Sequence, residues 1–556
     1  MTTKIMKISE RIFEQNGLNC IQNLVLSENN YDPNNFYYLF PDYNSIPMTI
    51  PDMLSFTPIL TESENFKKEV FSNHGKKFCI IGDYDVDGIF ATLILYLTLD
   101  KLGESVSYVI PNRFEDGYGM KKQHIDKAID RGAECIITVD NGIGCKEAVK
   151  YAKERGLHVI ITDHHIPEKS VLPEDVLIVN PKYNDDLFKE ICGANVAFKL
   201  ARVLLEANSI FDRDFISELA FYAAVATVTD SMPLIGENRL LVQSVCAYID
   251  FLKEKRLFYA NRILKVLQSL GGRFFLRDGT TLANPDLFGF SIGPAVNAYS
   301  RVDGDCEPLI EAIIDIANRG ISYNNESLDM NKQRQDMTTI LMNDVKYSYD
   351  PVEVFLFNKK DYDFEIGGLL GLIASRITND EKKVSIIGLI GEDQFEFSAR
   401  SIPGYSIFDG VERIRQSHPE LGITGGGHAN AMGLRMPINQ KNLEKFRSLI
   451  NKDFIENHID IEEHIFVLEP EYIDFYADEI CKFNFFGNSA KNLLFTYTGT
   501  VKQFDNFNKM LYVGDYCFKT FKFDEELVGK DISILFEIKS NSKNGAYFKT
   551  EKISGG

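Results

Sequence analysis

The stretch Lys76–Gly88, with the sequence KKFCIIGDYDVDG, decides how the rest of the chain is interpreted. Its first half is a short apolar run typical of a buried strand. The apolar stretch Gly88–Leu102 follows and predicts a buried helix. Three acidic residues, Asp83, Asp85 and Asp87, stand where the strand gives way to the helix. Since open α/β sheets bind ligands beyond the carboxyl ends of their strands, this acidic turn is predicted to lie at a binding edge.

The alternation of short apolar runs and helical stretches continues to residue 163. Strands are predicted at SVSYVI (105–110), ECIITVD (134–140) and LHVIITD (157–163), and helices over Lys121–Arg131 and Gly144–Arg155. Strands and helices that alternate at this spacing are typical of βαβ units, so we predict a parallel sheet.

Beyond residue 163 the pattern changes twice. The region up to Leu270 is mainly helical, and a long polar stretch, Glu307–Val345, predicts helices that bridge two lobes. A second α/β pattern then precedes a tail of alternating, aromatic-rich strands typical of a small β-barrel. The predicted organisation is an N-terminal segment over 1–72 packed on the first domain, a parallel-sheet α/β domain over 73–305, a helical linker over 306–348, a smaller α/β domain over 349–455 and an OB-like β domain over 456–556.

Composition is that of a folded protein outside the membrane. Of 556 residues, 44% are hydrophobic and 25% are charged, and no apolar run is long enough to span a bilayer. The nine cysteines are scattered singly, which favours buried free thiols in a reducing cytoplasm. Met1–Ser9 lacks the apolar core of a signal peptide. A cytoplasmic location without membrane contact is expected.

The net charge of −20 argues against non-specific binding to duplex nucleic acid, because phosphate affinity comes mostly from Lys and Arg. A local basic groove, or divalent cations bound among the acidic residues, would offset this charge. Composition therefore leaves the partner undecided.

Further acidic and histidine residues stand at the ends of the predicted strands. Asp140 ends the third strand and Asp163-His164-His165 ends the fourth, while Asp230 follows an apolar helical run. Each has an ordinary alternative: a helix N-cap for Asp140, a chance pair for the histidines and a structural turn for Asp230. If the sheet is parallel, however, the three strand ends converge on one edge.

An EF-hand loop also begins with the pattern of DYDVDG. Its twelfth position requires Glu, whereas this chain has Ile94, and a strand precedes the motif where an EF-hand needs a helix. The calcium-loop interpretation is therefore disfavoured.

Carboxylates and imidazoles without cysteine pairs suit two Mn²⁺ or Mg²⁺ ions rather than structural zinc. Two such ions clamp the attacking water and the leaving oxygen of a phosphate ester. Asp140, in the middle of the set, is well placed to bridge them. A second imidazole beside the ions could bind phosphate or protonate the leaving oxygen.

The order DYDVDG, VDNG, TDHH and a later DSMPL resembles the DHH phosphoesterase family. Seven further segments, within about 73–436, resemble its RecJ branch of single-strand exonucleases: IPNRFEDGYG (110–119), NPK (180–182), GANVAFKLA (193–201), GPAVNAYSR (293–301), GLLGLIASR (368–376), SARSIPG (398–404) and GGGHANAMGL (425–434). The resemblance implies a DHH catalytic domain followed by a DHH-associated domain.

The resemblance also implies roles for residues that match the family motifs. Metal ligands would be Asp85, Asp87, Asp140, His164 and Asp230. The catalytic group would comprise His165, which contacts the scissile phosphate, with Asp163 and Asp83. Substrate would be bound by Arg113, Asn297, Arg301, Arg376, Ser398, Arg400, Gly426, Gly427 and His428, of which Arg113, Ser398 and Arg400 resemble a pocket for a 5′-phosphate.

The activity implied is metal-dependent 5′ to 3′ degradation of single-stranded DNA in repair or recombination, by a monomer that meets single-strand-binding or repair proteins. Two alternatives stay open: a DHH enzyme for short RNA or cyclic dinucleotides, and a non-catalytic replication scaffold. Stacking of bases on tail aromatics is a further expectation, with Phe504, Phe507, Tyr512 and Phe518 as candidates, although core packing is the commoner role. Three residues depart from the family pattern and bear on substrate grip: Asn195, Ala295 and Ser300.

Overall fold

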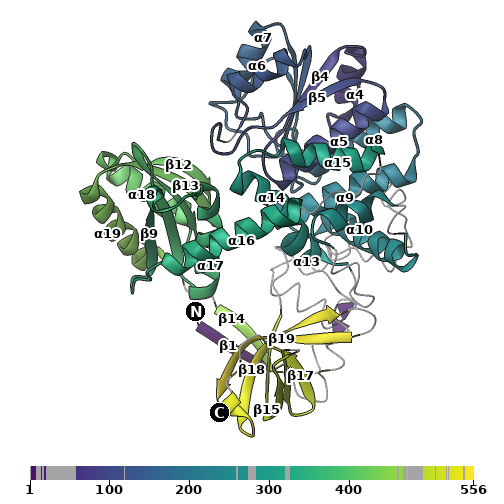
Figure 1. Cartoon of the computed structure of the whole chain (residues 1–556). Coiled ribbons are helices and arrows are strands. Elements are labelled where there is room, and N and C mark those ends of the chain that lie inside the picture. Colours follow the sequence, from purple (N-terminus) through teal and green to yellow (C-terminus); the bar gives the residue numbers. More distant parts are fainter. Residues whose placement is uncertain are drawn as a thin grey trace.

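The computed structural model describes residues 58–459, except 118, 258–260, 273–282 and 320–325, and residues 493–555, except 508, 521–522, 524 and 542–544. It also describes residues 473 and 477 and the strands β1 (Thr2–Lys7), β2 (Glu14–Gln15), β3 (Leu18–Asn19) and β14 (Glu462–Val467). Most of the predicted N-terminal segment lies outside these residues. Figure 1 shows three bodies: a large α/β body, a smaller α/β body joined to it by helix α16, and a β body that contains the C-terminus.

A five-stranded parallel sheet forms the centre of the first body, in the order β5-β4-β6-β7-β8. Ile81 pairs with Val109 on one side, and Val139 pairs with Thr162, so the carboxyl ends of the strands meet at one edge. This confirms the predicted parallel sheet. Its strands are β4 (Lys77–Ile81), β5 (Ser105–Val109), β6 (Cys135–Val139), β7 (His158–Thr162) and β8 (Leu177–Val179).

Helices cover both faces of this sheet (Figure 1). Side chains alternate along β4, so that Phe78 and Ile80 enter one core while Cys79 and Ile81 enter the other. The first core is shared with α4, α5, α8 and α9, and the second with α6 and α7. The helices are α4 (Ser63–Ser72), α5 (Val86–Lys101), α6 (Lys122–Asp130), α7 (Lys146–Glu154), α8 (Gly193–Ala207) and α9 (Arg213–Thr229).

The remaining helices of the first body pack against the same large core. They are α10 (Gly236–Glu254), α11 (Arg262–Ser269), α13 (Pro285–Leu287), the π-helical turn η4 (Phe288–Ile292), α14 (Gly293–Val302) and α15 (Glu307–Arg319). Four apolar residues of α15 are buried in this core: Leu309, Ile310, Ile313 and Ile316. The structure therefore differs from the predicted linker over 306–348, because only α16 (Glu326–Asp344) bridges the two α/β bodies.

The second body has a mixed sheet in the order β12-β13-β11-β10-β9, in which only β9 and β10 are parallel. Helix α17 packs on one face of the sheet and α18 and α19 on the other. The elements are β9 (Val352–Asn358), η6 (Gly367–Leu369), α17 (Leu370–Glu381), β10 (Val384–Ile390), β11 (Gln394–Arg400), α18 (Ile407–Ser417), β12 (Thr424–His428), β13 (Ala431–Pro437) and α19 (Gln440–Asn457).

The third body confirms the predicted β-barrel. A register shift between Val501 and Gln503 lets β15 pair with β18 along its first half and with β16 along its second, which closes the strands into a ring. Strand β14 extends this sheet, and β1 pairs with β14, so residues 2–7 lie in this body and not on the first. The ring consists of β15 (Leu494–Asp505), β16 (Met510–Val513), β17 (Tyr516–Lys519), β18 (Asp531–Asn541) and β19 (Gly545–Gly555).

Aromatic side chains fill the ring. Phe518 is fully buried and lies 5.1 Å from Phe536 and 5.5 Å from Phe548 between ring centroids. Its predicted role in base stacking is therefore wrong, because its faces are covered by core neighbours. Phe507, in contrast, is 93% exposed in the loop between β15 and β16.

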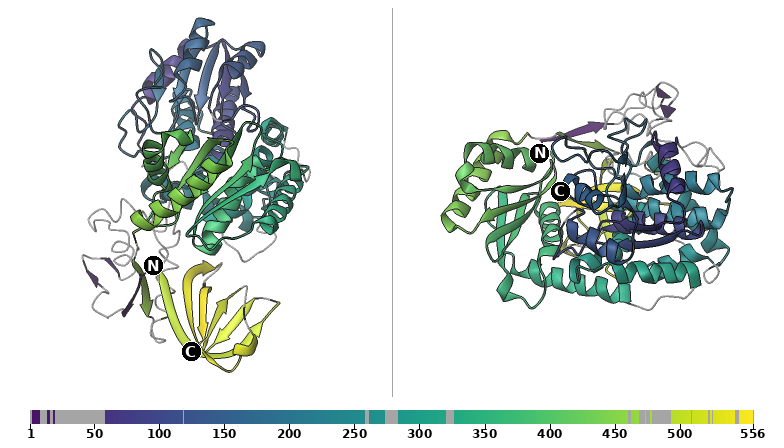
Figure 2. Two further views of the ribbon diagram at one scale, coloured as in Figure 1. Left: turned by 90° about the vertical axis from the view of Figure 1, so that its left-hand side faces the viewer. Right: turned by 90° about the horizontal axis from the view of Figure 1, so that it is seen from above.

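In Figure 1 and in the left view of Figure 2, the β body lies below the two α/β bodies. Among the described residues, no helix has the length and apolarity that crossing a bilayer requires.

Asn141 ties two neighbouring strand ends together. Its buried side-chain amide donates to the carbonyl oxygens of Ile81 (3.1 Å) and Val139 (3.0 Å). We expect Asn141→Ala to lower the free energy of unfolding by about 1–3 kcal/mol, because both hydrogen bonds are lost inside the protein. Urea unfolding in EDTA measures this, with the exposed Asn65→Ala as control. A loss no larger than that of the control would contradict it.

Candidate active site

The loop between β4 and α5 holds the first acidic residues. Asp85 caps α5, since its carboxylate accepts from the backbone N–H groups of Asp87 (3.0 Å) and Gly88 (3.1 Å). A Cβ atom at Gly88 would lie only 2.5 Å from the backbone nitrogen of Asp83. Glycine at position 88 therefore allows the loop to fold back tightly and brings Asp83 and Asp85 to the sheet edge.

Asp140 follows β6 with a φ of 58°, in the left-handed region that Asp and Asn tolerate better than most residues. At Gly193, the first residue of α8, a Cβ would lie 2.6 Å from the Cβ of Asp140. The backbone N–H groups of Gly193 and Ala194 donate to the two oxygens of Asp87, at 2.6 and 2.7 Å. The amino end of α8 therefore compensates part of the charge of Asp87.

The two histidines and Asp230 complete the cluster. The Nε2 atom of His164 lies 3.1 Å from Asp140 Oδ1, 3.5 Å from Asp87 Oδ2 and 3.7 Å from Asp230 Oδ2. Asp230 stands at the carboxyl end of α9. Carboxylates from three separate elements thus surround one imidazole, as the convergence of strand ends predicts.

Burial strongly perturbs the titration of this cluster. Burial, together with the neighbouring Asp85, raises the pKa of Asp83 to about 8. Burial and then the surrounding carboxylates raise the pKa values of Asp140 and Asp230 well above their usual range. Burial lowers the pKa of His164 to about 4, which keeps its ring neutral. Neutral imidazole is the form that binds metals.

The donor set fits divalent cations. Candidate ligand atoms fall into three groups within 4.8 Å: Asp83, Asp85 and Asp140; Asp87, His164 and Asp230; and Asp140, His164 and His165. Buried atoms of Asp83 and Asp140, the Oδ1 of each, have no hydrogen-bond donor among the described residues. Hard oxygen ligands with one or two imidazoles suit Mn²⁺ or Mg²⁺, whose charge would relieve the carboxylate repulsion.

His165 is held differently from His164. Its Nδ1 lies 2.8 Å from Asp163 Oδ1, and Asp163 also accepts from the backbone of Ile143 at 2.9 Å. Burial opposes the charged ring, but Asp163 and the neighbouring acids outweigh it and raise the pKa of His165 to about 9. Asp163 therefore orients the ring at Nδ1, and the surrounding carboxylates favour its charged form.

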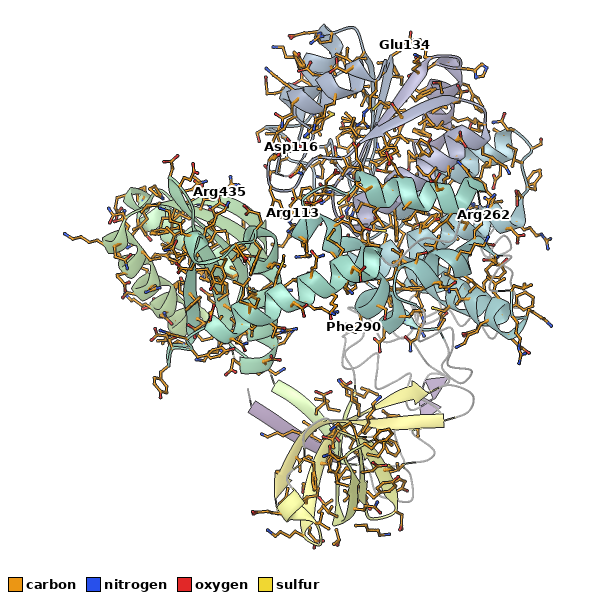
Figure 3. All side chains as sticks on the ribbon, viewed as in Figure 1. Arg113, Asp116, Glu134, Arg262, Phe290 and Arg435 are labelled. Atoms are coloured by element: carbon orange, nitrogen blue, oxygen red, sulfur yellow. The ribbon has the colours of Figure 1, made fainter. Side chains whose placement is uncertain are left out.

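Arginines gather beside this acidic edge. Burial, followed by the charges of Arg113, Arg334 and Arg400, lowers the pKa of Arg301 to about 9. The guanidinium of Arg113 lies 5.1 Å from the ring centroid of Tyr84, in the acidic loop. Positive charge thus converges from the loop after β5, from α14, from α16 and from β11, and it repels itself unless an anion is bound. Figure 3 shows Arg113 on the side of the first body that faces the second.

Arg400 is oriented within the second body. Its Nε donates to Ser375 Oγ at 3.1 Å, and its Nη1 donates to Ser398 Oγ at 3.2 Å and to the carbonyl of Ala399 at 2.8 Å. Arg301 donates to the carbonyl of Gly368 at 3.0 Å, which links the two bodies. The structure therefore brings together Arg113, Arg301, Ser398 and Arg400.

The remaining predicted substrate residues differ in how they relate to the arginine cluster. Arg376 is exposed on α17 and acts on the pKa of Arg334. Gly426, Gly427 and His428 form an exposed edge strand, β12, which no described contact joins to the arginines. Asn297 lines a pocket with Arg301.

Sequence reasoning missed Arg334 as a member of the arginine cluster. It lies on the polar helix α16, where Asn331 Oδ1 accepts from its Nε at 3.0 Å. No sequence pattern distinguishes this arginine from the other charged residues of a solvated helix. Only the packing of α16 between the bodies shows that Arg334 belongs with Arg301.

The three residues that depart from the family pattern are all buried. Ala295 is fully buried in the large core, and Ser300 is buried with its hydroxyl donating to the carbonyl of Asn297 at 3.3 Å. Asn195 donates to Asn238 at 3.4 Å.

Comparison with known proteins follows the same division of the chain. The model of the DHH family, N-terminal domain, matches residues 77–227, and the DHHA1 domain model matches residues 362–456. The single-stranded-DNA-specific exonuclease RecJ of Salmonella typhimurium is 33% identical over 395 residues, covering 67% of this chain and 65% of that protein. The Escherichia coli protein of the same name is 32% identical over 402 residues, covering 68% and 67%. The chain thus spans about two thirds of the length of these relatives.

Among solved structures, the crystal structure of RecJ in complex with Mn²⁺ from Thermus thermophilus has a TM-score of 0.74. It is 20% identical, and the match covers 100% of this chain and 80% of that one. The shared fold therefore includes all three bodies.

Asp140→Asn tests the metal centre through two changes in the thermal unfolding temperature, one without metal and one with Mn²⁺. Without metal, we expect a higher Tm than wild type, because one buried carboxylate charge is removed and Asn tolerates the left-handed backbone. With Mn²⁺, we expect the wild-type Tm to rise by several degrees and the variant Tm to stay unchanged. Thermal unfolding with and without Mn²⁺ measures both, with the exposed Asp130→Asn as control. An equal Mn²⁺ response in all three proteins would contradict the assignment.

Proposed function

The chain belongs to the DHH family, and on that premise we propose that it hydrolyses single-stranded DNA from the 5′ end to mononucleotides with the help of two divalent cations. The observation that carries the proposal is the juxtaposition of a buried carboxylate–imidazole cluster with a half-buried arginine cluster. The first suits cations at a reacting phosphate, and the second suits the anionic end of a strand.

On the basis of the ligand groups we propose two metal positions. Asp83, Asp85 and Asp140 would hold one ion, and Asp87, His164 and Asp230 the other. Asp140 is common to two of the groups, one of which also contains His164, and is therefore the proposed bridge. Two divalent ions bound there supply Lewis-acid activation of water and neutralise charge that develops on the phosphate.

His165 provides a proton at the reacting phosphate. Asp163 holds the imidazole at Nδ1 and keeps the ring protonated, so Nε2 can donate to a phosphate oxygen or to the leaving oxygen. The pair resembles the general arrangement in which a buried carboxylate orients a catalytic imidazole. His164, neutral because it is buried, does not compete for this role.

The arginine cluster would set the polarity of attack. Guanidinium groups bind phosphate oxygens in a bidentate manner, and Arg400 is already oriented by Ser375 and Ala399. Arg113 contacts Tyr84 in the loop that bears Asp83 and Asp85, so a phosphate bound at Arg113 and Arg400 lies beside the metal centre. A terminal 5′-phosphate anchored there would place a bond near the strand end at the metals.

Substrate and polarity are tested with single strands bearing a 5′-phosphate and a label at either end. With Mn²⁺, we expect early release of the 5′ label as mononucleotide and no release from duplex. Early loss of the 3′ label, or cleavage of very short RNA or cyclic dinucleotides alone, would keep the phosphodiesterase chemistry and reject this substrate. No cleavage at all by folded, Mn²⁺-binding protein would favour a non-catalytic scaffold.

Arg400→Gln tests the end-binding pocket. We expect kcat/KM on a 5′-phosphorylated strand to fall by about 10- to 100-fold, since a charge-assisted contact is worth about 1.5–3 kcal/mol. On a 5′-hydroxyl strand the loss is expected to be small. Steady-state kinetics on the two strands measures the ratio.

The matched control is Arg213→Gln. Arg213 is exposed at the first turn of α9, whereas Asp230 stands at the other end of the same helix. At 1.5 Å per residue, the helix separates the two by roughly 25 Å. An Arg400→Gln variant that loses activity equally on both strands would contradict the role of Arg400 in binding the end.

A further inference from the structure

A pocket of about 380 Å³ adjoins the metal centre on the side of Asp230. Thr229 and Ser231, which flank Asp230, line it, and Arg301 and Arg334 contribute positive charge. Its volume is at the low end for ligand pockets, so it has room for one nucleoside unit rather than several. Phe290 lines the same pocket, and its side chain is 80% exposed.

The backbone directs Phe290 outward. Phe290 lies in the π-helical turn η4, and such turns occur mostly as single insertions, frequently at functional sites. Gly289 and Gly293, on either side of it, face the end of α9. A Cβ at Gly293 would lie 2.3 Å from Thr229 Cγ2, and one at Gly289 would lie 3.5 Å from Val228 Cγ1. This close packing fixes the turn against the residues just before Asp230 and leaves Phe290 on the open side.

The pocket has two chemically different ends. Arg301 and Arg334 suit a phosphate, whereas the exposed Asp286 beside the aromatic end repels one. Asn297 lines this pocket, and its buried Oδ1 has no hydrogen-bond partner among the described residues. A nucleotide would therefore lie with its phosphate at the arginines, with Asn297 available to a sugar or base, and with its base against Phe290.

We infer that Phe290 is a stacking platform for the base of the nucleotide whose phosphate is bound by these arginines. Stacking on an aromatic face suits single strands of any sequence, because every base has such a face. Figure 3 shows Phe290 on the side of the first body that faces the β body. This inference rests on the proposed function, since it takes single-stranded nucleic acid as the ligand.

Binding of a single strand tests the platform without requiring cleavage. The probe is a 5′-phosphorylated oligothymidylate with 2-aminopurine at one of the positions one to six, titrated in EDTA with anisotropy and 2-aminopurine fluorescence as readouts. We expect one position to be quenched by the wild-type protein and not by Phe290→Ala, with Kd raised about tenfold in that variant. Phe290→Trp should restore both the quenching and the affinity.

The matched control is Phe211→Ala. Phe211 is 69% exposed and precedes α9 at the end remote from Asp230, so its loss should change neither readout. In Mn²⁺, Phe290→Ala should raise KM about tenfold and leave kcat nearly unchanged, because stacking holds the strand and does not touch the reacting atoms.

The outcomes separate this inference from the proposed function. Equal binding and quenching by wild type and Phe290→Ala would overturn the platform, even if single strands are cleaved. A Phe290→Trp variant as weak as Phe290→Ala would also overturn it, because shape and not stacking would then matter. If neither the wild-type protein nor any variant cleaves single strands, the proposed function fails. The fluorescence titration in EDTA still decides the role of Phe290.

Discussion

The repulsion among carboxylates buried at one edge of the parallel sheet is the constraint on which the rest of the site depends. Asp83, Asp87, Asp140 and Asp163 are all buried, and such charges are tolerated only where partners compensate them. The amino end of α8 compensates Asp87, and His165 compensates Asp163. The Oδ1 atoms of Asp83 and Asp140 have no hydrogen-bond donor among the described residues, and that is where cations would complete the fold.

The same reasoning applies with opposite sign to the arginines. Arg301 is surrounded by Arg113, Arg334 and Arg400, so the protein holds an excess of half-buried positive charge beside an excess of buried negative charge. Carbonyls and hydroxyls, such as those of Gly368 and Ser375, orient the arginines and leave their charge in place. Cations on one side and a phosphate on the other would satisfy both clusters. A net charge of −20 is therefore compatible with a nucleic-acid substrate.

The arginine cluster is built from residues of both the first and the second body. Helix α16 joins them and contributes Arg334, α14 contributes Arg301, and β11 contributes Arg400. The strand-end residues belong to one body, whereas the arginine cluster takes residues from both. The β body adds a further surface, on which Phe507 is exposed while Phe518 is part of the core. This difference in exposure between the two phenylalanines follows from the closure of the barrel. The alternation of polar and apolar residues along the sequence does not predict it.

The amino-acid sequence by itself determined the parallel sheet, the order of the bodies and the set of acidic and histidine residues at the sheet edge. It could do so because strand periodicity is local and because parallel strands must end together, so Asp85, Asp140 and His164 converge whatever else the chain does. Only the tertiary structure decided that α15 belongs to the first core, that β1 joins the β body and that Arg334 belongs with Arg301. These depend on contacts between segments far apart in the chain, where burial and repulsion are set by packing that no local pattern records.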